Sequence, residues 1–169
     1  GIVVSGLRLR WYARSAARGL LGLDVGDWDL LRASGLGRLH VPAPREEGSV
    51  PELALEERPD LAKLLRRAGI GAAFSFLVGR IGEDPALVGR VMDTARSIRR
   101  IHGSFETAVR FWTPWPSDAR VAPPGFVEPS DRDAWAATDM GENPGAWVPD
   151  RIRLAVERRD FYLRRALER

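Results

Sequence analysis

The stretch Ile70-Gly-Ala-Ala-Phe-Ser-Phe-Leu-Val-Gly-Arg-Ile81 is apolar on nearly every side, and it decides the fold. A segment of this kind is buried all round. Its Ala and Leu residues favour a helix, whereas the alternation of Phe74, Phe76 and Val78 is typical of a strand. Of these two alternatives, we predict a central helix over residues 70–81.

Helix signals stand on both sides of this stretch. Upstream, Pro59 suits a first-turn position, and Gly69 suits the end of a helix. Downstream, Asp84 is a candidate N-cap before Pro85, and apolar residues recur every three to four positions as far as Ile101. Further helices are expected over residues 5–21, 24–36, 105–112 and 149–168, with a short segment over 52–57. The pattern therefore predicts an all-α fold, an irregular bundle of five to seven helices.

The 169 residues suggest a single helical domain over 1–169. Within it, residues 1–22 are interpreted as a basic arm, residues 41–50 as a linker loop, and residues 113–148 as an extended strap rich in Trp and Pro. The core is expected in residues 59–112 and 149–168. No apolar stretch reaches the ~18 residues that a transmembrane helix needs.

Arginine dominates the basic residues, since Lys63 is the only lysine among 26 of them. This bias, with a single Asn and no Gln, is typical of a GC-rich genome, so only the placement of Arg is informative. Residues 1–22, 61–112 and 151–169 carry net charges of +4, +5 and +4, whereas residues 23–60 and 113–150 each carry −5. The acidic connections either cover the basic helices or leave them for an anionic partner.

The positions of the arginines indicate which residues would bind an anionic partner. Arg10, Arg14 and Arg18 recur every four residues before the first acid, Asp24, which places them on one face of the expected basic N-terminal helix. The candidate anion- or partner-binding residues are Arg10, Arg14, Arg18, Arg96, Arg99, Arg100, Arg158 and Arg159. We expect them to meet phosphate or the carboxylates of another chain, and the alternative is that they are solvated.

The strap over 113–148 contains aromatic residues among its prolines. Disordered linkers are poor in aromatics, and Trp is enriched at interface hot spots. The candidate interaction residues are Trp112, Trp115, Phe126, Trp135 and Trp147. These rings pack either against another chain or against the helices of their own chain.

Signals for catalysis or for metal binding are weak. The chain has no Cys, and it lacks the phosphate-loop, nucleophile-elbow, zinc-protease and calcium-loop motifs. His102 ends the clearest helix, where a cation interacts well with the helix dipole, and His40 is expected to be solvated ahead of the linker. We therefore expect no enzyme activity, no metal and no cofactor.

The function that fits these patterns is that of a non-enzymatic helical adaptor or accessory subunit of a larger protein assembly. Its partners would be other protein chains, in a homo- or hetero-oligomer, and its location cytoplasmic or peripheral to that assembly. The alternative is an Arg-mediated nucleic-acid-binding protein. An anionic membrane surface facing residues 5–21 is a third candidate partner. Salt separates the first two, because phosphate binding weakens steeply with ionic strength.

Overall fold

The protein is built on a four-stranded parallel sheet, so the prediction of an all-α bundle of five to seven helices is wrong. The computed structural model describes residues 9–43, 52–80 and 83–112, together with positions 134, 148, 150, 152–154 and 156. In chain order the elements are β1 (Trp11–Arg14), η1 (Arg18–Gly22), α1 (Val25–Ala33), β2 (Leu36–Val41), η2 (Leu55–Glu57), α2 (Arg58–Ala68), β3 (Gly71–Val78), α3 (Pro85–Ile101) and β4 (Glu106–Phe111).

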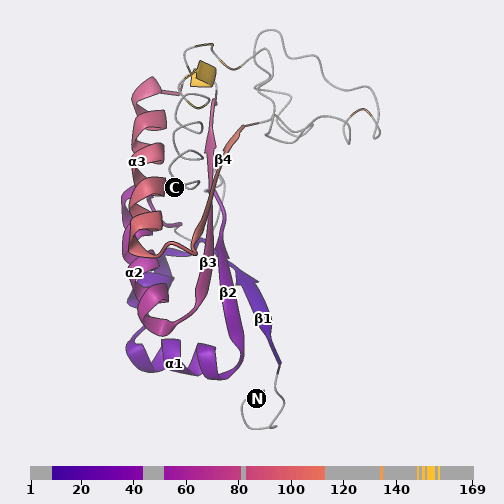
Figure 1. Cartoon of the computed structure of the whole chain (residues 1–169), viewed down its shortest axis with the longest axis vertical. Coiled ribbons are helices and arrows are strands. Elements are labelled where there is room, and N and C mark those ends of the chain that lie inside the picture. The colour runs from indigo at the N-terminus through magenta and orange to yellow at the C-terminus, as the bar shows by residue number, and fades with distance from the viewer. Residues whose placement is uncertain are drawn as a thin grey trace. The chain divides into compact units, whose positions relative to one another are not determined.

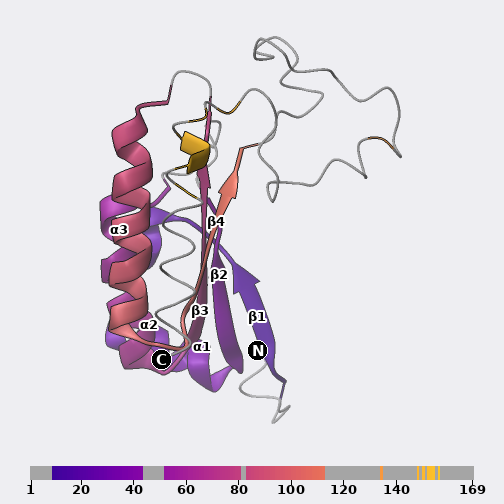
Figure 2. The same cartoon turned by 45° about the horizontal axis from the view of Figure 1, so that its top comes forward.

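The strands lie in the sheet in the order of the chain, β1-β2-β3-β4. β1 pairs with β2 in parallel, with Tyr12 opposite Arg38, and β2 pairs with β3 in parallel, with Val41 opposite Phe74. Each of these parallel pairs needs a crossover, which α1 and α2 supply. Both crossovers advance by one strand in the same direction, so right-handed connections place α1 and α2 on the same face of the sheet (Figures 1 and 2).

The chain divides into two compact units, which are described separately. The first unit comprises Gly1–Phe76 and Asp93–Ala108, and therefore holds β1, β2, most of β3, α1 and α2. The second unit comprises Leu77–Met92 and Val109–Arg169. In the second unit the Trp112 amide donates to the Val78 carbonyl at 2.8 Å, and the Gly79 amide donates to the Glu83 carboxylate.

The stretch 70–81 forms a strand and not the predicted helix. In β3, Ala72, Phe74, Phe76 and Val78 are fully buried, while the alternate residues are half-buried. Those alternate residues from Gly71 to Ser75 are small, so the segment looks apolar all round although only one of its faces is core. The recurrence of large apolar residues at every second position of this stretch correctly indicated a strand.

Two further helix predictions are wrong. The expected basic N-terminal helix over 5–21 is β1 followed by the short helix η1 in its described part, and the expected helix over 105–112 is β4. A spacing of four residues puts side chains on one face of a strand as well as a helix, so the Arg pattern could not separate the two. Ser104, shortly before β4, places its hydroxyl 2.6 Å from Nδ1 of His102.

The helices with cap signals formed as predicted. Asp24 caps α1, because its carboxylate accepts from the Asp27 amide at 2.8 Å. α2 carries Pro59 in its first turn and ends at Gly69, which is left-handed at φ 66°. The Asp84 carboxylate accepts from the Ala86 amide at 2.9 Å at the start of α3. Of the recurring apolar residues of α3, Val91, Ala95 and Ile98 are buried, and Leu87 is half-buried.

Gly35 joins α1 to β2 in a conformation that side chains rarely adopt, with φ at 99°. A Cβ built there would lie 1.8 Å from the carbonyl oxygen of Leu9. The close approach is fixed by two hydrogen bonds, from the Trp11 amide to the Gly35 carbonyl at 3.0 Å and from Trp11 Nε1 to the Ser34 carbonyl at 2.9 Å. Gly35 therefore sets the position at which the chain enters β1.

We expect Gly35→Ala to destabilise the protein by at least about 1–3 kcal/mol, the usual cost of a strained backbone conformation, because the clash with Leu9 adds to it. Urea unfolding of both proteins measures this difference. Gly22→Ala is the matched control, since a Cβ there meets nothing within 4 Å, and it should stay within about 0.5 kcal/mol of the wild type. Equal stability of the two variants would contradict the assigned turn.

Candidate functional site

The sheet of the first unit has one apolar and one polar face. Leu39 and Val41 of β2 are buried on the side of α1 and α2, whereas Arg38 and His40 alternate with them. We call the opposite side the polar face; its described residues are Arg10, Tyr12, Arg14, Arg38, His40, Ala73, Ser75 and Glu106. Tyr12 is 81% exposed there, and Arg14 and Arg38 are exposed as well.

Three polar side chains form a row across the polar face, two near the carboxyl ends of β1 and β2 and the third, Ser75, inside β3. Arg14 is the last residue of β1 and pairs in register with His40 of β2. Nε2 of His40 lies 2.9 Å from the Ser75 hydroxyl on β3. A guanidinium, an imidazole and a hydroxyl together offer hydrogen-bond donors and positive charge, which suits an anionic group.

An ion pair closes the amino-terminal side of the polar face. Arg38 of β2 pairs with Glu106 of β4, although β3 lies between these strands. The register places Gly71 of β3 beside Arg38, so no side chain separates the two charged groups. Among the described strand residues of the polar face, Glu106 is the only acid, and this pairing leaves the row at Arg14 positively charged.

Arg58 lies under this region and is fully buried. Its Nη1 donates to the Ser75 carbonyl at 2.9 Å, its Nη2 donates to the Pro42 carbonyl at 2.8 Å, and its guanidinium lies 5.1 Å from the Phe76 ring centre. Burial lowers the pKa of Arg58 to about 10, and the charge of Glu52 acts in the opposite direction. The group therefore stays protonated at neutral pH.

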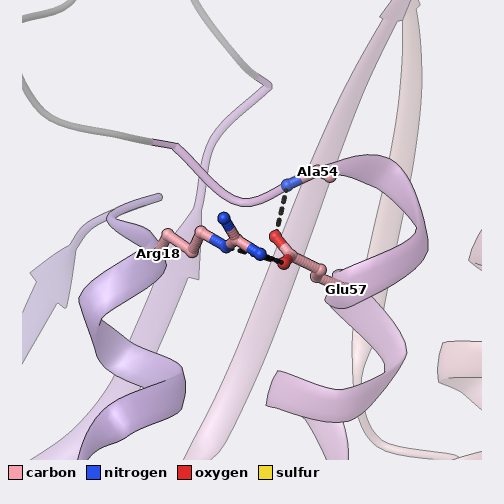
Figure 3. Close-up of polar contacts among 3 residues, drawn as sticks. All are labelled: Arg18, Ala54 and Glu57. Atoms are coloured by element: carbon pink, nitrogen blue, oxygen red, sulfur yellow. Dashed lines mark hydrogen bonds and ion pairs between the residues drawn. The ribbon is translucent and has the colours of Figure 1, made fainter.

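A short segment, residues 52–57, crosses the carboxyl end of β1. The Leu53 amide donates to the Ala16 carbonyl at 2.8 Å, beside an antiparallel bridge between Ala17 and Glu52. Figure 3 shows the second attachment, in which Arg18 of η1 contacts Oε1 of Glu57 at 2.7 Å while Oε2 accepts from the Ala54 amide at 2.9 Å. The segment 52–57 holds η1 against the start of α2.

The predicted basic residues separate into distinct groups. Arg10 and Arg14 are exposed and form no side-chain hydrogen bond or ion pair among the described residues, whereas Arg18 is paired with Glu57 of the same chain. On α3, Arg96 pairs with Asp93 at 3.3 Å, while Arg99 is half-buried and Arg100 is exposed. The structure thus brings Arg10 and Arg14, and not Arg18, to the polar face.

Other predicted residues are only partly within the described chain. Trp112 is half-buried at the end of β4. Outside the described residues lie Trp115, Phe126, Trp135, Trp147, Arg158 and Arg159. The strap proposed for 113–148 and its role in binding another chain therefore stay predictions.

Sequence reasoning missed His40, Ser75 and Arg58. His40 was expected to be solvated, but it is half-buried against Ser75. Recognising β2 and β3 as adjacent strands would have brought these two together. Arg58 also carried a signal, because a cation in the first turn of a helix opposes the helix dipole and needs another reason to be there.

Comparison with family models, curated proteins and solved structures finds no match to this chain. Among the described residues, no three His, Asp or Glu side chains gather as a metal site would require. The described helices also include none with the length and apolar character to cross a membrane. The candidate site therefore rests on the geometry of the polar face.

The attachment of segment 52–57 through Arg18 and Glu57 leads to a prediction about stability. Arg18→Ala should cost less than about 1 kcal/mol, because the Arg18–Glu57 pair is largely exposed on the Arg side. Glu57→Ala should cost about 1–2 kcal/mol, because it also removes the acceptor for the Ala54 amide and a favourable charge beside the start of α2. Chemical denaturation measures both values, and the assignment fails if Arg18→Ala costs more than Glu57→Ala.

Proposed function

We propose that the first unit binds a small anionic ligand, carrying a phosphate or carboxylate group, on the polar face beside Arg14 and His40. The observation that carries the proposal is the row from Arg14 through His40 to Ser75, on the side of the sheet opposite α1 and α2. In parallel α/β sheets, ligands bind at the carboxyl ends of the strands, and Arg14 and His40 of this row stand at the carboxyl ends of β1 and β2.

The charges of the site support an anion over a cation or a neutral ligand. Arg14 is exposed and has no ion-pair partner among the described residues, and the acid of this face, Glu106, is already paired with Arg38. The buried charge of Arg58 adds to the positive potential behind Ser75. An anion placed against Arg14 would receive charge-assisted hydrogen bonds from its guanidinium, which are stronger than neutral ones.

Thermal unfolding with sodium pyrophosphate as the probe tests this function, with sodium chloride at equal ionic strength as the reference. A ligand at ten times its Kd stabilises by about 1.4 kcal/mol, which raises Tm by about 3–6 °C for a chain of this size. We expect such a rise for the wild type and its loss in Arg14→Ala.

The matched control is Arg67→Ala, because Arg67 is an exposed residue of α2 without a side-chain partner among the described residues. This variant should keep the full response to pyrophosphate. The same loss in both variants would mean that pyrophosphate acts through overall charge and would contradict a site on the polar face.

A second candidate is binding of single-stranded nucleic acid, and the exposure of Tyr12 favours it. Tyr12 lies on β1 between Arg10 and Arg14, with Arg38 opposite in register. An exposed aromatic ring flanked by guanidinium groups combines base stacking with phosphate contacts.

If this second candidate is correct, a fluorescent oligothymidylate of about fifteen nucleotides will bind with an affinity that falls steeply with salt. Tyr12→Ala should weaken binding by about 1–3 kcal/mol, the usual contribution of one stacked base. Fluorescence anisotropy measures both effects. Tyr12→Phe keeps the ring and should bind as the wild type does; a loss as large as that of Tyr12→Ala would exclude stacking.

A further inference from the structure

The paired ladder of β2 and β3 stops abruptly at a proline. Val41 and Phe74 are the last residues in register, and the next residue of β2 is Pro42, which has no amide hydrogen to donate. Beyond this point the carbonyls of Pro42 and Ser75 need donors from elsewhere. Arg58 supplies them, because each carbonyl accepts from one terminal nitrogen of its guanidinium.

The guanidinium therefore bridges Pro42, which follows β2, and Ser75 of β3. It is held in place by the Phe76 ring and by complete burial, and if it rotated away the carbonyls of Pro42 and Ser75 would lose this donor. Its Nε is buried and has no hydrogen-bond partner among the described residues, so the two carbonyls are the acceptors that hold the guanidinium there.

Ser75 connects this guanidinium to the polar face. Its carbonyl accepts from Arg58, and its hydroxyl lies 2.9 Å from Nε2 of His40. Ser75 thus accepts a hydrogen bond from the buried Arg58 through its backbone and contacts the imidazole of the candidate site through its side chain. A displacement of the Ser75 backbone would move the hydroxyl away from His40.

We propose that Arg58 is a positioning residue, which fixes the Ser75 backbone and thereby the orientation of the His40 imidazole. The proposal rests on the proposed function for its purpose, since an oriented imidazole matters where His40 meets an anionic ligand. Arg58 itself does not touch that ligand, because its side chain is fully buried.

The test is the pair of ring ¹⁵N chemical shifts of His40 in the full chain, measured by NMR at one pH, because these shifts report the tautomer and hydrogen bonding of the imidazole. We expect Arg58→Met to change them and to weaken pyrophosphate binding about threefold to tenfold. Arg66→Met is the matched control: Arg66 also lies on α2 and donates to a backbone carbonyl, that of Ile101, at 3.0 Å. This control should leave both readouts unchanged.

Two other variants keep the proposal testable if Arg58→Met does not fold. Arg58→Lys keeps a cation and should retain part of the wild-type His40 signature. Ser75→Ala keeps the carbonyl and removes the hydroxyl, so it should change the His40 shifts while leaving Arg58 in place. Unchanged His40 shifts in a folded Arg58→Met, or in Ser75→Ala, would overturn the positioning role.

The outcomes for the two proposals are distinguishable. Altered His40 shifts in Arg58→Met and in Ser75→Ala support the positioning role even where the wild type does not bind pyrophosphate, a result that would overturn the proposed function alone. Conversely, pyrophosphate binding that depends on Arg14, together with His40 shifts that do not respond to Arg58, keeps the function and overturns the positioning role.

Discussion

Parallel pairing of β1, β2 and β3 in chain order is the constraint on which the rest of the first unit depends. Each parallel pair requires a crossover, and successive right-handed crossovers in one direction put their helices on one side. The large apolar residues of β2 and β3 consequently face α1 and α2. The other side is left to small and polar residues, and this division produces the polar face.

The pairing between β2 and β3 stops at the carboxyl end of β2, and Arg58 compensates for the hydrogen bonds that the pairing no longer supplies. A proline at position 42 ends the β2–β3 ladder, and a buried guanidinium takes the two carbonyls that the ladder leaves. Burying a cation is unfavourable unless it is hydrogen-bonded, which the lowered pKa of Arg58 reflects. The same two hydrogen bonds join α2 to Ser75 of β3 and to Pro42, the residue that follows β2.

How much could be predicted from the sequence depended on whether the signal was local. Helix caps are local, so Asp24, Gly69 and Asp84 marked their helices correctly. The strands were missed because the polar face of β3 carries Gly, Ala and Ser, which hides the alternation of Phe74 and Phe76. Arg14 was identified through the four-residue spacing of Arg10, Arg14 and Arg18, which places side chains on one face of a strand as well as of a helix. The approach of Ser75 to His40 depends on strand order, which no local pattern specifies.

The most direct test of the account is to map, by amide chemical shifts, where pyrophosphate binds on the full chain. The account predicts perturbations at the amides of Arg14, His40 and Ser75, on three adjacent strands, with little change along α3. Perturbations centred on Arg96, Arg99 and Arg100, with the strand amides unchanged, would contradict a binding site on the polar face.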